Sequence, residues 1–375
     1  MNKVTIKKCS EYNKNLIKQK IYDIFNSHNF TKKLKKINRV LLKPNLLGSY
    51  EPDKAVTSHP TFIVALAEIL HDYNIKTVLF DNPGGSSKFK NVIIQTGIKE
   101  LAEKYNIEIL NPSDMGVYKF NTDPQLVISK VFIDSDAIIN LSKMKTHSYT
   151  LFTGAIKNMY GIVPGAAKAN YHKLAPHPSK FAEIVVDIYS HVHKNIIFNF
   201  MDGILGMDGD GPSNGNAKKF EIILGSESAI ALDYIATKTM GYNPNKVPVT
   251  TIAAERFNFD LQNIDVESDF DLDYVLEDVN IRTSKNLNLL LKILSAPFKD
   301  FVKYFFWTKP AFDSTRCTQC RKCIRFCPVS ALSLPSASKA PVVDADKCIR
   351  CLCCVETCPE NAVEMQKSFL AKLLM

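Results

Sequence analysis

This sequence of 375 residues has no long apolar run, and we expect no leader segment. No run of about 18 or more apolar residues is present, so we expect no membrane-spanning helix. Lysines interrupt residues 1–12, and nothing there resembles a signal peptide. The sequence therefore predicts a protein of the reducing cytoplasm.

A basic stripe with interleaved aromatic residues is also absent, although basic residues outnumber acidic ones and the formal net charge is +9. Such a stripe is typical of nucleic-acid binding, which we therefore do not expect. A nucleophile triad, a phosphate-binding P-loop, a flavin fingerprint and a zincin motif are missing as well. These absences exclude several common enzyme classes and leave the cysteines as the strongest chemical signal.

Eight of the ten cysteines form a repeated pattern between residues 317 and 358. Each half reads C-x2-C-x2-C-x3-C-P, and the second half repeats the first at an offset of 31 residues. In such runs, three cysteines bind one 4Fe-4S cluster and the fourth binds the other cluster. The expected ligands are Cys317, Cys320, Cys323 and Cys358 for the first cluster, and Cys348, Cys351, Cys354 and Cys327 for the second.

Zinc and disulfide bonds are the alternatives for these cysteines. Structural zinc sites usually pair two C-x2-C motifs, rather than three closely spaced cysteines and a Cys-Pro. Disulfide bonds require an oxidising compartment. The pattern resembles the bacterial two-cluster ferredoxin family over about residues 311–366. Cys353, which lies between two expected ligands, is predicted to be a small buried thiol, and Cys9 a structural residue.

The rest of the chain alternates short apolar runs with helical patterns. Expected strands at residues 40–42, 77–80 and 137–141 are separated by helical segments such as residues 60–73. This alternation predicts an α/β fold with a mostly parallel sheet covered by helices, followed by a small C-terminal α+β ferredoxin-like domain. The expected segments are the α/β domain at residues 1–285, an apolar helical linker at 286–310, the cluster-binding domain at 311–366 and an amphipathic tail at 367–375.

Polar residues follow several expected strands, and ligands bind beyond the carboxyl ends of the strands in such sheets. Lysines there suit an anionic group. His147 is the first catalytic candidate, because the ordinary pKa of histidine lies near neutrality, and Lys145 is the second. The candidate substrate-binding residues are Lys43, Asn45, Lys143, Lys157, Asn158, Asp202 and Asp208, of which the two aspartates could also hold a metal ion. The alternatives are a solvated basic loop at residues 142–147 and an exposed turn at residues 199–212.

Four short blocks contain most of these candidates. They are Lys43-Pro44-Asn45, Ser142-Lys143-x-Lys145-Thr146-His147, Lys157-Asn158-x-x-Gly161, and Asp202-Gly203 before Gly209-x-Gly211-Pro212. Their combination resembles the uncharacterised family called domain of unknown function 362, which is often fused to a C-terminal ferredoxin module. The resemblance covers about residues 1–250. It implies that the polar loops form one site, and it implies no particular reaction.

Two redox functions fit these features, and a third, less favoured role makes the clusters structural staples of a ligand-binding protein. In the first, the protein is an oxidoreductase that passes electrons between two 4Fe-4S clusters and an anionic substrate at the α/β domain. In the alternative, it is a ferredoxin-like electron carrier whose α/β domain binds a partner or a small ligand without catalysis. Both functions require a redox partner protein. An apolar stripe at residues 298–306 is expected to dock one domain on the other, and contact with a membrane surface is the less favoured alternative.

Overall fold

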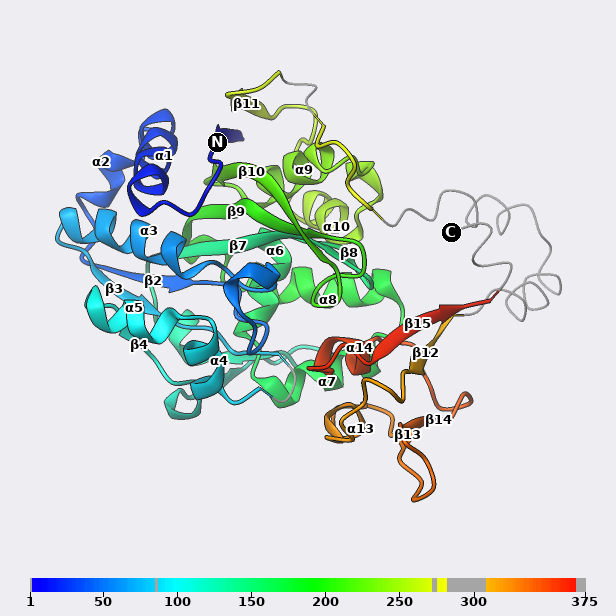
Figure 1. Cartoon of the computed structure of the whole chain (residues 1–375). Coiled ribbons are helices and arrows are strands. Elements are labelled where there is room, and N and C mark those ends of the chain that lie inside the picture. Colours follow the sequence, from blue (N-terminus) through cyan, green and yellow to red (C-terminus); the bar gives the residue numbers. More distant parts are fainter. Residues whose placement is uncertain (1, 85–86, 272–274, 282–307, 369–375) are drawn as a thin grey trace.

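The computed structural model describes residues 2–84, 87–271, 275–281 and 308–368 (Figure 1). The expected apolar linker lies outside the described residues except for residues 308–310, and so does its apolar stripe. The expected C-terminal tail lies outside them as well, except for residues 367 and 368.

A single mixed sheet forms the centre of the large domain. Its strand order is β11-β1-β10-β9-β7-β2-β3-β4, and β8 pairs with β7. The run from β9 to β4 is parallel throughout, whereas β10 is antiparallel to both of its neighbours. The bounds are β1 Lys3–Lys8, β2 Arg39–Lys43, β3 Lys76–Leu79, β4 Glu108–Ile109, β7 Ile138–His147, β8 Leu151–Thr153, β9 Ile196–Asp208, β10 Asn216–Ser226 and β11 Asp265–Ser268. The expected α/β fold with a mostly parallel sheet is confirmed.

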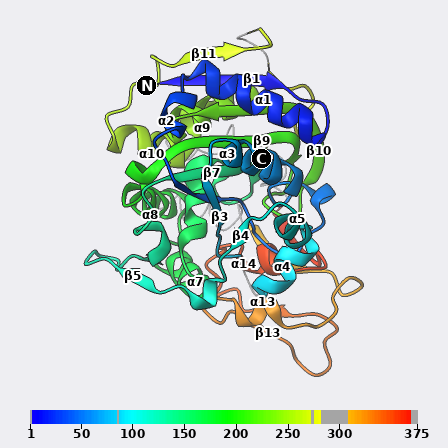
Figure 2. The same cartoon turned by 90° about the vertical axis from the view of Figure 1, so that its left-hand side faces the viewer.

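Helices cover both faces of this sheet, as Figure 2 shows. Along β2, Val40 and Leu42 belong to one buried cluster, with residues of α1 and α3, while Leu41 belongs to another, with residues of α8, α9 and α10. Successive side chains of a strand point to opposite faces, so a strand buried on both sides is apolar throughout. The helices are α1 Lys14–Ser27, α2 Thr31–Leu34, α3 Pro60–Asp72, α4 Phe89–Gln95, α5 Ile98–Lys104, α6 Ala155–Asn158, α7 Gly165–Leu174, α8 Pro178–Ser190, α9 Ala229–Thr239 and α10 Pro248–Arg256.

The remaining strands and helices are short. A hairpin of β5 (Val117–Lys119) and β6 (Val127–Ser129) stands apart from the large sheet. The C-terminal module pairs β12 (Thr308–Phe312) with β15 (Val363–Lys367), and β13 (Leu332–Ser333) with β14 (Val342–Val343). Its helices are α13 (Lys322–Arg325) and α14 (Cys353–Thr357). Both views place α14 beside α7 of the α/β domain (Figures 1 and 2).

The cysteine-rich module is an internal repeat in its backbone as well as in its sequence. Three residues with positive φ in the first half recur 31 positions later, in the pairs Gln319 and Arg350, Arg321 and Leu352, and Ser330 and Asn361. The backbone N–H of Ala331 donates to Cys327 Sγ at 3.2 Å, and that of Ala362 donates to Cys358 Sγ at 3.3 Å. The two halves therefore hold their fourth cysteine in the same way.

A buried carboxylate anchors the short helix α6. Asp233 on α9 accepts hydrogen bonds from the backbone N–H groups of Ala155 at 2.5 Å and Ile156 at 3.0 Å. These N–H groups lack intrahelical partners because they begin the helix. Gly154 allows the close approach, since an added Cβ would lie 2.2 Å from Asp233 Oδ1. Asp233 thus fixes the turn that carries Lys157.

We predict that Gly154→Ala lowers the free energy of unfolding by about 2 kcal/mol, because the new methyl group would displace the buried Asp233 carboxylate. Gly116→Ala is the matched control, since an added Cβ there meets nothing within 4 Å. Anaerobic urea denaturation of both variants measures the effect. Equal stability of the two variants would show that Asp233 does not constrain this turn.

Candidate functional site

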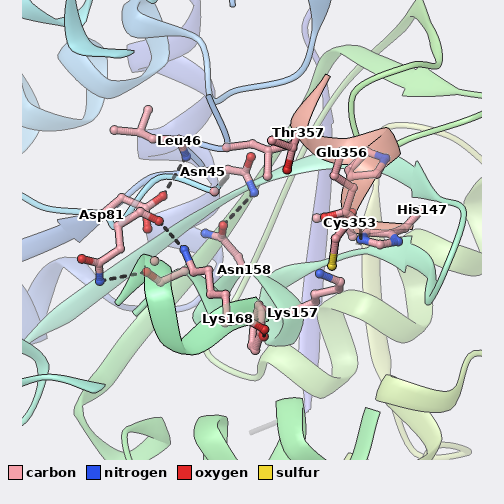
Figure 3. Close-up of a pocket in the computed structure, with 18 of the residues that line it drawn as sticks. Asn45, Leu46, Asp81, His147, Lys157, Asn158, Lys168, Cys353, Glu356 and Thr357 are labelled. Carbon is pink, nitrogen blue, oxygen red and sulfur yellow. Dashed lines mark hydrogen bonds and ion pairs between the residues drawn. The ribbon is translucent and has the colours of Figure 1, made fainter. Parts of the chain in front are cut away.

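A cavity lies where the α/β domain meets the cysteine-rich module (Figure 3). Its empty space, with the open mouth included, is about 850 Å³. The α/β domain contributes the segments that follow β2 and β3, the end of β7, and helices α6 and α7. The cysteine-rich module contributes Phe326 and three residues of α14, namely Cys353, Glu356 and Thr357. Both parts of the chain are therefore needed to form the cavity.

The parallel sheet brings the polar residues of the α/β domain to one place. Asn45 follows β2, Asp81 follows β3, and Lys145 and His147 lie at the end of β7. Because β3, β2 and β7 are neighbouring parallel strands, their carboxyl ends meet at one edge. Asn45 Nδ2 donates to Asn158 Oδ1 at 2.9 Å, which links this edge to α6.

Three lysines line the cavity. Lys145 Nζ donates to Asn45 Oδ1 at 3.1 Å and to the Val56 carbonyl at 2.6 Å, and neither acceptor carries a charge. Burial, together with the positive charges of Lys157 and Lys143, holds the pKa of Lys145 well below its ordinary value. Burial likewise lowers the pKa of Lys157, and it lowers that of Lys168 to about 8. Removing ammonium groups from water is costly, so burial shifts each of these lysines towards its uncharged amine.

Two carboxylates only partly balance these lysines. Asp81 is engaged elsewhere, because it forms an ion pair with buried Lys43 at 2.8 Å and accepts the Leu46 N–H at 2.7 Å. Glu356 Oε1 is buried without a hydrogen-bond partner among the described residues. Lys157 forms neither a hydrogen bond nor an ion pair with the part of the chain that the structure describes, although its Nζ lies 5.4 Å from the centre of the Tyr160 ring. The cavity therefore has unneutralised positive charge and suits an anion.

His147 is held as a hydrogen-bond donor. Its Nδ1 accepts the backbone N–H groups of Tyr149 at 3.1 Å and Thr150 at 3.3 Å, so the neutral ring carries its hydrogen on Nε2. Nε2 lies 3.5 Å from Glu356 Oε1. Burial and the neighbouring charges of Lys157 and Lys145 hold the pKa of His147 well below its ordinary value. The ring is therefore neutral near pH 7, although the sequence argument for His147 relied on an ordinary pKa.

Of the sequence-derived candidates, Asn45, Lys145, His147, Lys157 and Asn158 line the cavity. Lys43 lies beneath it, where its ammonium pairs with Asp81.

The other three candidates lie outside the cavity lining. Lys143 Nζ pairs with Asp202 Oδ2 at 2.8 Å, and the Tyr12 hydroxyl donates to Asp202 Oδ1 at 2.8 Å, so this cluster is internally satisfied. Asp208 accepts the Asn280 backbone N–H at 3.0 Å. These contacts give Lys143, Asp202 and Asp208 structural partners instead of a place at the cavity.

Sequence reasoning missed several lining residues. Asp81 follows an expected strand, so the strand-end rule places it at this edge of the sheet, but it was not among the candidate site residues. Lys168 lies within a run of small residues, and its position in the chain alone indicated no ligand. His172, Cys353 and Glu356 depend on how helices pack, and the last two come from the other module. No local sequence pattern predicts that such residues line a cavity.

The eight repeated cysteines gather around two smaller hollows. One is lined by Cys317, Cys320, Cys323 and Cys358, and the other by Cys327, Cys348, Cys351 and Cys354. Each set takes three cysteines from one half of the repeat and the fourth from the other half. Thiolate sets of this composition suit an iron–sulfur cluster. The chain thus combines an α/β domain with an iron–sulfur module.

Comparisons with known proteins agree with this class. The model of the family described as domain of unknown function (DUF362) matches residues 40–238, and that of the 4Fe-4S dicluster domain matches residues 309–359. The chain belongs to the DUF362 family and carries an iron–sulfur cluster-binding module, as the sequence predicted. A thylakoid-associated protein of Synechocystis sp. is 31% identical over 222 residues, which cover 58% of this chain and 68% of that protein. No helix within the described ranges is long and apolar enough to cross a membrane.

Cys353 and Cys354 are adjacent on α14 but have different expected roles. Both line the hollow of the second cysteine set, but Cys353 also lines the large cavity, whereas Cys354 belongs to the expected ligand set. We predict that Cys354→Ser lowers the iron content and the visible absorbance of anaerobically purified protein, because a cluster loses one thiolate. Cys353→Ser should leave both quantities unchanged. Equal loss of iron in the two variants would contradict this assignment of the ligands.

Proposed function

We propose that the protein is an oxidoreductase that passes electrons between two 4Fe-4S clusters and an anionic small molecule in the large cavity. The first cluster is bound by Cys317, Cys320, Cys323 and Cys358, and the second by Cys348, Cys351, Cys354 and Cys327. When bound, these clusters supply or accept electrons one at a time. The α/β domain binds and orients the small molecule.

The position of Cys353 carries the proposal. This residue lines the large cavity and also the hollow surrounded by the second set of cysteines. One side chain thus separates the proposed cluster from the proposed substrate. A carrier whose α/β domain binds a ligand without catalysis has no need to hold that ligand next to a cluster. The shared wall therefore favours catalysis over the carrier function.

The charge of the cavity supports an anionic substrate. Lys145, Lys157 and Lys168 line the cavity, and Lys43 pairs with Asp81 beneath it. With Glu356 as the second carboxylate, four lysines face two acidic residues. A carboxylate or phosphate group on the substrate would neutralise the excess and restore hydrogen bonds to Lys157. An anion beside Lys157 and Lys168 also raises their pKa values and keeps them protonated.

Two further residues have roles that follow from their hydrogen bonds. His147 offers Nε2–H to an oxygen atom of the substrate, because Nδ1 is already occupied by two backbone N–H groups. Lys145 is the candidate general base of the cavity, because burial and neighbouring cations favour its uncharged amine, which can accept a proton. Asn45 holds the Lys145 amine in place through its side-chain oxygen.

Electrons reach the clusters from a redox partner protein. Arg321 and Arg350 are exposed on the cysteine-rich module, and such cations suit an acidic partner. We propose the cytoplasm as the location, since iron–sulfur proteins with many free thiols suit a reducing compartment. The name of the Synechocystis relative makes contact with a membrane surface the alternative.

The test is the reoxidation of the clusters by small molecules. Holoprotein reduced with dithionite under anaerobic conditions is mixed with a panel of carboxylic and phosphorylated acids that also carry a reducible carbonyl group or double bond, and the visible absorbance is followed. Reduction of that group takes two electrons, one from each cluster, and two protons from the solvent. We expect one class of acid to reoxidise the clusters. Lys157→Met should slow this reaction at least about 100-fold while leaving the spectrum intact, because it removes a half-buried positive charge from the cavity lining.

Lys180→Met is the matched control, because Lys180 is exposed, pairs with neighbouring Glu183 and does not line the cavity. Its reoxidation rate should equal that of the unaltered protein. Reoxidation by acceptor proteins alone, with no response to any acid, would contradict the proposal and favour the carrier function.

The pH dependence of anion binding gives a second test. Lys168 is a cation below its pKa of about 8 and an uncharged amine above it. Sulfate, whose charge is constant in this range, should therefore bind tightly at about pH 7 and lose affinity as the pH rises through about 8. Lys168→Arg should weaken this loss, because arginine stays charged. Titration calorimetry measures the sulfate affinity at each pH. A sulfate affinity that rises with pH would contradict the role of the lysines.

A further inference from the structure

A second hollow adjoins the large cavity along the line where the two parts of the chain meet. The two hollows share Leu47, Gly84, Glu356 and Thr357 in their linings. The outer hollow has about 860 Å³ of empty space, open solvent included. A molecule that extends beyond the inner cavity would therefore enter the outer hollow.

Three cations line the outer hollow, and they come from both sides of it. Lys88 precedes α4 of the α/β domain, whereas Lys322 and Arg325 lie on α13 of the cysteine-rich module. None of the three forms an ion pair with any described residue. The Arg325 guanidinium has one weak contact, to the Cys320 carbonyl at 3.5 Å.

Other residues of the outer hollow can donate hydrogen bonds but add little negative charge. Ser49, Ser87, Asn91 and Tyr50 carry hydroxyl or amide groups, and Glu356 is the one acidic residue in the lining. Convergent cations with hydroxyl donors are the groups that recognise phosphate oxygens, and a guanidinium can contact two of them at once. Cations that served only a protein partner would more often stand on a convex surface than line a hollow.

We infer that the outer hollow is a subsite for a phosphate-type group, so that the substrate is elongated, with an acidic head in the inner cavity and a phosphate tail between α4 and α13. This inference rests on the proposed function, because it extends the same substrate outward. The phosphate tail supplies binding energy at a distance from the reacting head. Lys157 then selects the head, and Lys88 and Arg325 select the tail.

Inorganic phosphate and tripolyphosphate are suitable probes, because the second spans several phosphate groups. Their affinities for anaerobic holoprotein are measured by titration calorimetry. We expect tripolyphosphate to bind at least about 10-fold more tightly than phosphate. Lys88→Ala and Arg325→Ala should each weaken tripolyphosphate about 5-fold or more, as expected for the loss of one charged hydrogen bond. Lys157→Met should weaken it as well.

Lys90→Ala is the matched control for Lys88→Ala, because Lys90 lies two residues further along and does not line the hollow. Lys88 is also remote in sequence from the cysteines, whereas Arg325 lies between two of them, so the visible spectrum is recorded for each variant. Tripolyphosphate affinity of Lys88→Ala within about twofold of that of Lys90→Ala would overturn the subsite.

The outcomes also separate this inference from the proposed function. If Lys88→Ala weakens tripolyphosphate and Lys157→Met does not, the outer hollow binds phosphate by itself, and the elongated substrate is overturned. If acids reoxidise the clusters and Lys88→Ala has no effect on tripolyphosphate, the subsite fails and the proposed function stands.

Discussion

The unneutralised positive charge beneath α14 is the constraint on which the rest of the structure depends. Lys145 is buried and Lys157 is half-buried, and neither pairs with a carboxylate among the described residues. Glu356 from the cysteine-rich module has a carboxylate oxygen that accepts no hydrogen bond from them. Burying ammonium groups in this way costs stability unless something compensates them. An uncompensated buried charge of this kind is typical of a ligand-binding site. Strongly shifted pKa values likewise occur most often at functional sites.

The satisfied cluster on the same sheet makes the contrast clear. Lys143 and Asp202 are both fully buried, and Tyr12 completes their hydrogen bonds. This pair needs no ligand and stabilises the sheet by linking β7 to β9. Two residues further along β7, Lys145 has only uncharged acceptors. One strand therefore carries a structural lysine and a lysine that faces the cavity, and the difference lies in their partners.

The sequence revealed the repeated cysteine pattern and the alternating strands and helices, because both depend on local spacing. It also brought Asn45, Lys145 and His147 together, since residues after parallel strands meet at one edge. The sequence could not show that Lys143 and Lys145 have different roles, because residues two apart in a strand are expected on the same face of the sheet. Between them the pairing with β9 jumps from Asp202 to Met207, and this irregularity sends the two side chains to different surroundings. The sequence did not indicate Glu356 as a site residue either, because its place at the cavity depends on how the two modules pack.

A crystal structure of anaerobically prepared holoprotein, with anomalous data at the iron edge, tests the central claim most directly. The account predicts iron in both cysteine hollows and a non-protein anion within about 3 Å of Lys157 Nζ, beside Cys353. Lys157 paired with a carboxylate of the protein itself, in a cavity closed to any anion, would contradict it.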